Sequence, residues 1–132
     1  MIGLDTNVLV RLLVRDDPRQ TKQAQEFIEA HCTDESPAFI NSVVLAELVW
    51  VLAHPYGYSR SEIVQALEQL IAGNDRVFEH HEQVRSALKA FGSSRIDFVD
   101  ALIAAINRTR GCEATATFDR RASRHDGFIH VA

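Results

Sequence analysis

Four acidic residues stand where their carboxylates could together hold a metal ion. Asp5 and Asp119 each follow a short apolar run, and Glu47 and Asp100 lie near the beginnings of two apolar helical segments. Oxygen ligands without cysteine or histidine at metal-ligand spacing suit hard cations such as Mg2+ or Mn2+. A cation held in this way lowers the pKa of a bound water and polarises a phosphate. The pattern therefore predicts a site for a hard divalent cation.

Two of these acids have apolar neighbours in the sequence. Glu47 lies between Ala46 and Leu48, and Asp100 lies between Val99 and Ala101. An unpaired carboxylate is expensive to bury, so both side chains are expected to need a cation or hydrogen bonds. Asp97 lies on the same helical face as Asp100, and like charges at this spacing repel unless something positive intervenes.

Structural roles for the acids stay open beside the metal-binding interpretation. Asp5 could be a turn residue after a strand, and Asp119 could be a turn acid before Arg120 and Arg121. Asp97 could be a negative charge favoured by the dipole at a helix N-terminus, and we prefer a structural or supporting role for it. The apolar flanks make a purely structural account harder for Glu47 and Asp100.

Short strand-like runs alternate with longer helical segments, which predicts an α/β fold with a mainly parallel central sheet and helices on both faces. Expected N-caps are Asn7 and Ser42, and Ser59 with Glu62 forms a capping box. We expect strands at 1–4, 38–41, 77–79, 114–118 and 128–131, and helices at 8–14, from 18 to about 31, 43–53, 60–72, about 82–91 and 97–110.

This alternation predicts that the four acids share one edge of the sheet. In a doubly wound sheet, helix N-termini and the carboxyl ends of strands lie on the same rim, where ligands bind. Asp5 and Asp119 come after expected strands, whereas Glu47 and Asp100 lie in the early turns of expected helices.

Length and composition favour one globular domain over residues 1–132, with 46% hydrophobic and 24% charged residues. Cys32 and Cys112 belong to no metal-binding pair and are expected to be free thiols in a reducing compartment. The N-terminus does not resemble a signal peptide and no apolar run is long enough to span a membrane, so we expect a cytoplasmic protein. The net charge of −4 disfavours nucleic acid, but two divalent cations at the acids would offset it.

Four segments in this order resemble the motifs of the PIN-domain nucleases, in particular the VapC toxins of bacterial toxin–antitoxin pairs, over nearly the whole chain. A lone aspartate-threonine-asparagine would be weak, but four motifs at the expected structural positions are specific. The segments are Asp5-Thr6-Asn7-Val8-Leu9, Val44 to Leu52 around Glu47, Asp97 to Ala104 around Asp100, and Thr117-Phe118-Asp119-Arg120-Arg121.

The resemblance implies a single PIN domain that acts as a Mg2+- or Mn2+-dependent endoribonuclease. Asp5, Glu47, Asp100 and Asp119 would be the metal-binding and catalytic residues. Thr6 and Thr117 would provide supporting hydrogen bonds, and Asp97 would also be a supporting residue. The resemblance also implies that the strands 1–4 and 114–118 are neighbours, that the chain is a homodimer, and that a small VapB-like antitoxin binds it.

The arginines near the acidic motifs are candidates for contacts with RNA phosphates. They are Arg11, Arg120, Arg121 and Arg124, whereas we expect Arg15 to be a solvated charge. The six histidines show no zinc-binding spacing, so surface or packing roles are expected for them.

Three other functions share part of this pattern. A haloacid-dehalogenase-like phosphatase also places an aspartate after the first strand, but it requires a second aspartate two positions later, where this chain has Asn7. A degenerate PIN-like module that binds RNA or protein without cleaving would be expected to lose acids, and this chain keeps them all. Nucleases of DNA or flap structures usually carry helical insertions that 132 residues leave no room for.

Overall fold

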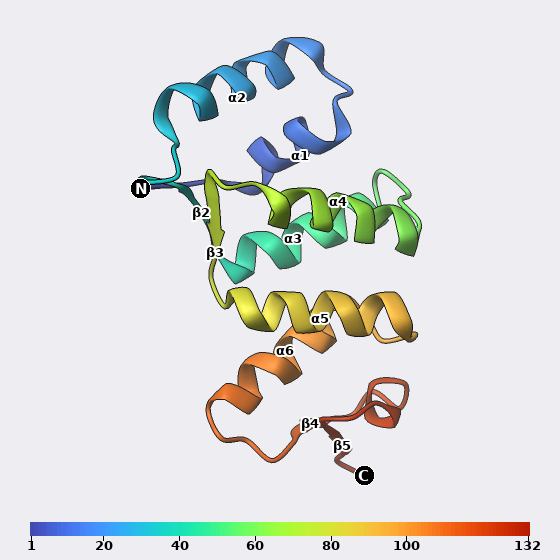
Figure 1. The fold of residues 1–132 in the computed structure, drawn as a ribbon. Helices are drawn as coiled ribbons and strands as arrows, with labels where there is room; N and C mark the ends of the chain where they lie inside the picture. Colours follow the sequence, from blue (N-terminus) through green and yellow to red (C-terminus); the bar gives the residue numbers. More distant parts are fainter. The chain divides into compact units, whose positions relative to one another are not determined.

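The computed structural model describes residues 1–132, which form two compact units, Met1–Glu79 and His80–Ala132 (Figure 1). The first unit contains β1 (Ile2–Gly3), α1 (Thr6–Val14), α2 (Pro18–His31), β2 (Ala38–Ile40), α3 (Ser42–Ala53), α4 (Arg60–Ala72) and β3 (Arg76–Phe78). The second contains α5 (His81–Ser93), α6 (Phe98–Thr109), β4 (Thr115–Thr117), the 3-10 helix η1 (Ala122–Arg124) and β5 (Phe128–His130).

The strands of the first unit form a parallel sheet in the order β1-β2-β3. In its register Ile2 lies opposite Ala38, and Ala38 lies opposite Arg76. The predicted α/β class and parallel pairing are therefore confirmed. The carboxyl ends of the three strands share one edge, where Asp5, Asn41 and Glu79 follow.

The helices of the first unit begin at capping side chains, but two of the predicted caps are wrong. The N-cap of α1 is Asp5 instead of Asn7, and the N-cap of α3 is Asn41 instead of Ser42, because the strands end earlier than expected. The capping box of Ser59 and Glu62 is confirmed. The largest fully buried side chains here are Leu9, Ile40, Leu45, Leu48, Leu52, Leu67 and Leu70.

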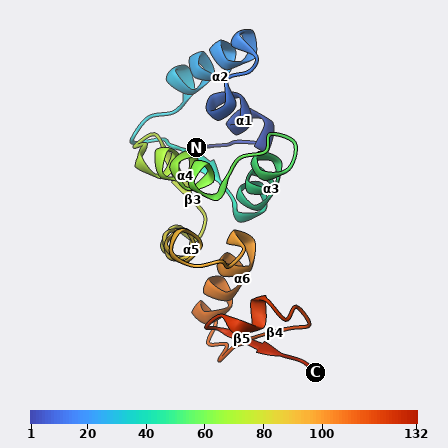
Figure 2. The same ribbon diagram turned by 90° about the vertical axis from the view of Figure 1, so that its right-hand side faces the viewer.

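In the second unit, α5 packs against α6, and α5 is seen end-on in Figure 2. Phe91 and Phe98 meet edge to face with ring centroids 6.0 Å apart, and Phe98 is fully buried. The strands β4 and β5 pair in parallel, with Thr115 opposite Phe128. Gly111 follows α6 with φ +87°, as expected for a glycine after a helix C-cap.

Within the two units, the partner of β1 is β2 and the partner of β4 is β5. β1 is an edge strand of its sheet, so the expected neighbourhood of the strands 1–4 and 114–118 concerns the placement of one unit against the other and stays a prediction. The single domain over 1–132 stays a prediction. No helix combines the length and the apolar character that crossing a membrane requires.

Candidate functional site

Asp5 lies at the carboxyl end of β1 as the first capping residue of α1. Its Oδ1 accepts a hydrogen bond from the Thr6 backbone N–H at 2.7 Å, and the residue is exposed. This bond orients the carboxylate and leaves Oδ2 available to a ligand. The Thr6 side chain is only 5% exposed, and its Oγ1 has no partner. Its predicted supporting hydrogen bond is therefore absent from the structure.

Glu47 lies on the exposed face of α3. The expectation that its carboxylate is buried among apolar residues is therefore wrong. Residues next to it in sequence, such as Leu48, point to other faces of the helix and are buried. Its neighbours on its own face are Val43 and Trp50, which are 78% and 57% exposed. Because α1 packs against α3, Asp5 and Glu47 belong to adjoining helices of the first unit.

Asp97 and Asp100 begin α6 in the second unit. Asp97 is the N-cap, and its Oδ1 accepts a hydrogen bond from the Asp100 backbone N–H at 3.1 Å. Partial burial raises the pKa of the Asp100 carboxyl above its ordinary value, and the charges of Asp97 and Asp119 raise this pKa further. His125 acts in the opposite direction. Asp97 therefore caps α6, and the ionised form of Asp100 is disfavoured by partial burial and by its acidic neighbours.

Asp119 follows β4 and is held by local hydrogen bonds. Its Oδ1 accepts from the backbone N–H groups of Arg121 at 2.8 Å and Ala122 at 3.2 Å. The Thr117 Oγ1 accepts from the Asp119 backbone N–H at 3.0 Å, so the hydrogen bond expected of Thr117 is present. As in Asp5, one carboxylate oxygen is used locally and the other is left for a ligand.

Sequence reasoning missed two side chains beside these acids. His125 follows η1 and acts on the charge of Asp100, although no spacing pattern marks it. Glu79 ends the first unit, and its Oε1 accepts a hydrogen bond from the Ser42 backbone N–H at the start of α3. The position of Glu79 after a strand, at the edge that carries Asp5, was the signal that could have identified it.

The residues fit a hard divalent cation in their chemistry. Neither unit by itself brings three or more His, Cys, Asp or Glu side chains together as a metal-binding group. The candidate ligands are nevertheless all oxygens, and the crowding of Asp100 by Asp97 and Asp119 is the kind of repulsion that a bound cation relieves. At the edge of the first unit, Thr6 Oγ1 and Ser42 Oγ are buried without partners. That Asp5 and Glu47 of the first unit share one metal site with Asp100 and Asp119 of the second stays a prediction.

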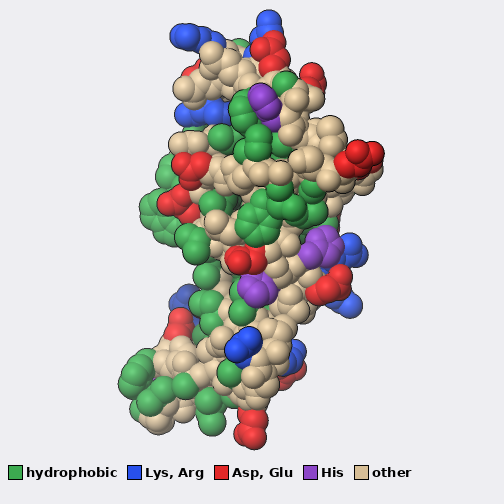
Figure 3. Space-filling model, turned by 90° about the vertical axis from the view of Figure 1, so that its left-hand side faces the viewer, with side chains coloured by type: hydrophobic (Ala, Val, Ile, Leu, Met, Phe, Trp, Pro, Cys, Tyr) green, Lys and Arg blue, Asp and Glu red, His purple; other side chains and the backbone are tan.

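The predicted phosphate-binding arginines differ in their surroundings. Arg11 forms an ion pair with Asp16 at 2.8 Å and donates to Gln20, so a phosphate would have to displace these contacts. The exposed arginines after Asp119 form no ion pair, so their guanidinium groups are available. They are Arg120, Arg121 and Arg124. Lysine and arginine side chains are scattered over the face in Figure 3 and form no single basic patch there.

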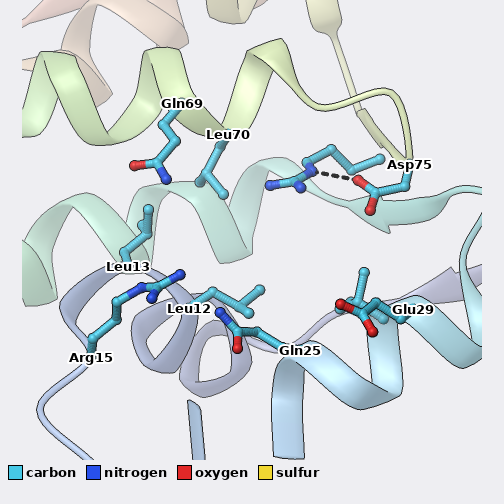
Figure 4. Close-up of a pocket in the computed structure, with 10 residues that line it drawn as sticks. Leu12, Leu13, Arg15, Gln25, Glu29, Gln69, Leu70 and Asp75 are labelled. Carbon is cyan, nitrogen blue, oxygen red and sulfur yellow. Dashed lines mark hydrogen bonds and ion pairs between the residues drawn. The ribbon is translucent and has the colours of Figure 1, made fainter. Parts of the chain in front are cut away.

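A cavity of about 310 Å3 lies in the first unit between the end of α1, α2 and α4 (Figure 4). It is lined by Arg15 and Arg76 and by Glu29 and Asp75, and Arg76 pairs with Asp75 at 2.9 Å. These charges balance, so the cavity favours neither an anion nor a cation. Arg76 begins β3, which places this end of the cavity at the edge of the sheet opposite to Asp5.

Comparison with known proteins gave two similarities. The family model described as PIN domain matches residues 2–127. The chain is also 28% identical over 120 residues to a VapC ribonuclease of Aquifex aeolicus (strain VF5), an alignment that covers 89% of this chain and 87% of the relative.

Proposed function

Because the chain belongs to the PIN-domain family, we propose that it is a divalent-metal-dependent endoribonuclease, the toxin of a VapC-type toxin–antitoxin pair. Within this proposal the two units assemble into a single PIN domain in the cytoplasm. The observation that carries it is the placement of the four motif acids. Asp5 and Asp119 follow parallel strands, and Glu47 and Asp100 lie in early helical turns. The similarity to a VapC ribonuclease over most of both chains supports RNA as the substrate.

We assign metal binding to Asp5, Glu47, Asp100 and Asp119, with Mg2+ or Mn2+ as the ion that suits oxygen ligands. When bound, the cation would supply positive charge to the phosphate oxygens and lower the pKa of a water molecule. The chain contributes orientation, because local hydrogen bonds to Oδ1 of Asp5 and of Asp119 fix their second oxygens. Asp97 acts on the backbone of Asp100, because its Oδ1 accepts a hydrogen bond from the Asp100 N–H at the start of α6.

In the proposed reaction, water attacks phosphorus and the bond from phosphorus to the 3′ oxygen breaks. Carboxylate oxygens that local hydrogen bonds leave free orient or deprotonate the attacking water, and no protein nucleophile is needed. The leaving 3′ oxygen takes a proton, so the products carry a 5′-phosphate and a 3′-hydroxyl. Arg120, Arg121 and Arg124 are the candidates to hold the RNA backbone, since their guanidinium groups are exposed after Asp119.

The test is cleavage of defined tRNA and rRNA substrates with Mg2+ or Mn2+ and with excess EDTA. Asp5→Asn keeps an oxygen that can accept from the Thr6 N–H, so the fold should persist. Removal of a ligand charge should lower the cleavage rate by more than the roughly 10- to 100-fold typical of outer-sphere partners. Asp34→Asn, at an exposed loop acid, is the matched control. Full activity in EDTA, or a normal rate for Asp5→Asn, would contradict the proposal.

We also propose that the toxin is a homodimer and that a VapB-like antitoxin inhibits it by placing an arginine among the acids. A guanidinium can form bidentate, charge-assisted hydrogen bonds to carboxylates and compete with the metal ion. Truncation of that arginine should restore cleavage more than it weakens the complex, because flanking apolar residues provide much of the affinity. A truncated antitoxin that binds well and still inhibits fully would indicate steric exclusion of RNA instead.

A further inference from the structure

We propose that Glu79 is a positioning residue of the candidate site, because its carboxylate fixes the first turn of the helix that carries Glu47. The inference rests on the proposed function, since it requires Glu47 to be a metal ligand. Glu79 lies outside the four acidic motifs, and no role is assigned to it by the resemblance.

Glu79 is bound to the junction of β2 and α3 through two atoms. Its Oε1 accepts from the Ser42 backbone N–H at 2.9 Å, a contact across 37 positions of sequence. Its own backbone N–H donates to the Ile40 carbonyl at 2.9 Å. Figure 1 shows the beginning of α3 beside the end of β3. The carboxylate is therefore held by the sheet and in turn holds the helix.

The first turn of a helix leaves backbone N–H groups without partners inside the helix. In α3 the Asn41 side chain accepts from the Val44 N–H at 2.8 Å, and Glu79 accepts from the Ser42 N–H. The Ser42 hydroxyl is buried and has no partner, so it adds no polar contact of its own. A negative charge at this end of a helix is also favoured by the helix dipole.

These hydrogen bonds are directional, whereas the apolar contacts that hold the rest of α3 are not. Leu45, Leu48 and Leu52 are buried and decide which face of α3 meets the core. The Glu79 and Asn41 contacts fix the rotation and axial position of the helix at its start. Glu47 follows Ser42 by five residues, so a shift of this turn moves its carboxylate.

Loss of the contact can be produced from both sides. Glu79→Ala removes the acceptor, whereas Glu79→Gln keeps an oxygen at the same place. Ser42→Pro removes the donor, and proline is well tolerated at the first position of a helix. Asn41 has φ −84° and ψ 166°, an extended conformation that suits a residue before proline. Ser42→Ala keeps the N–H and removes only the hydroxyl, which has no partner.

Glu62→Ala is the control for a loss of stability without a shift of the site. Glu62 Oε1 accepts from the Ser59 backbone N–H at 3.0 Å at the start of α4, a helix that carries no candidate ligand. The variant therefore loses a helix-terminal hydrogen bond of the same kind as Glu79→Ala.

The experiment is calorimetric titration of the full chain with Mn2+ alone, accompanied by the melting temperature of each variant. Glu79→Ala and Ser42→Pro should each weaken Mn2+ binding about 10-fold, the lower end for outer-sphere partners of a metal site. Their combination should weaken binding by less than the product of the two single effects, because both variants remove the contact between Glu79 and Ser42. Glu79→Gln, Ser42→Ala and Glu62→Ala should stay within about twofold of the parent, since each leaves the contact or the site intact.

Glu47→Gln separates failure of this inference from failure of the proposed function. Should Glu47→Gln weaken Mn2+ binding while Glu79→Ala and Ser42→Pro leave it unchanged, the positioning role is wrong and the ligand assignment stands. Equal weakening by Glu62→Ala would mean that general destabilisation is responsible, which also overturns the positioning role. Unchanged binding in Glu47→Gln overturns both. If Glu79→Ala does not fold, the comparison of Ser42→Pro with Ser42→Ala decides the question.

Discussion

Replacement of Asp97 separates two opposing effects of one carboxylate. As the N-cap of α6, Asp97 accepts a hydrogen bond from the Asp100 N–H at 3.1 Å, which stabilises the helix. As a charge, it disfavours the ionised form of Asp100 and raises the pKa of that carboxyl. Asp97→Ala removes both effects, whereas Asp97→Asn removes the charge and keeps the capping oxygen.

The expected magnitudes follow from these contacts. Loss of an N-cap typically costs about 1 kcal/mol of unfolding free energy. Relief of repulsion between like charges one turn apart returns about 0.2 to 0.5 kcal/mol. Asp97→Ala should therefore lower the unfolding free energy of the metal-free protein by about 0.5 to 1 kcal/mol. For Asp97→Asn the lost dipole interaction and the relieved repulsion are similar, so its stability should lie within about 0.5 kcal/mol of the parent.

Urea unfolding of the metal-free protein at neutral pH, followed by circular dichroism, measures both differences. Asp126→Ala, at an exposed acid of the same unit, serves as the control. If Asp97→Asn were as destabilising as Asp97→Ala, the charge and not the capping hydrogen bond would be what matters, and the reasoning would be refuted.

Three further predictions concern the second unit. Phe98→Ala should lower the unfolding free energy by about 3 to 5 kcal/mol, because the Phe98 side chain is fully buried in the folded protein. If urea unfolding showed a loss no larger than that of Ile103→Ala, at an exposed position, the prediction would be contradicted. Gly127→Ala should lower the unfolding free energy by about 1 kcal/mol or more, because Gly127 has φ +89° and a Cβ there would lie 3.0 Å from the Arg108 side chain. An unchanged melting temperature would contradict this prediction. The raised pKa of Asp100 means that the metal-free native state binds more protons than the unfolded chain between the ordinary and the raised pKa. The favourable contribution of protonated Asp100 to stability is complete below the ordinary pKa and is lost as the pH rises through the raised pKa. Asp100→Asn should therefore flatten the fall of stability with rising pH. An unchanged slope of the urea midpoint against pH would contradict this prediction.

Local signals in the sequence predicted most of the elements. Pro18 and the capping box of Ser59 and Glu62 each mark a helix start that the structure contains. The caps of α1 and α3 were misassigned because Asp5 and Asn7, like Asn41 and Ser42, are all residues that can cap a helix. Which of them does so depends on where the preceding strand leaves the sheet, and this is decided by pairing with distant strands.

The site was predictable in its residue types and less so in their surroundings. Asp100 has the unfavourable charge expected of it because its carboxylate is partly buried and because its like-charged neighbour Asp97 lies three positions away in the sequence. The environment of Glu47 was misjudged because chain neighbours of a helical residue point elsewhere. Glu79 was missed because its contact with Ser42 spans 37 positions, so that its place after a strand was the one signal in the sequence.

Trp50 gives α3 an optical label. It is the one tryptophan of the chain, it lies on the same exposed helical face as Glu47, and its ring stacks on His54 with centroids 4.7 Å apart. Indole emission excited at the red edge of protein absorption therefore reports on this helix alone. At a fixed pH, a change of emission on addition of Mn2+ follows events at α3 without any attached dye.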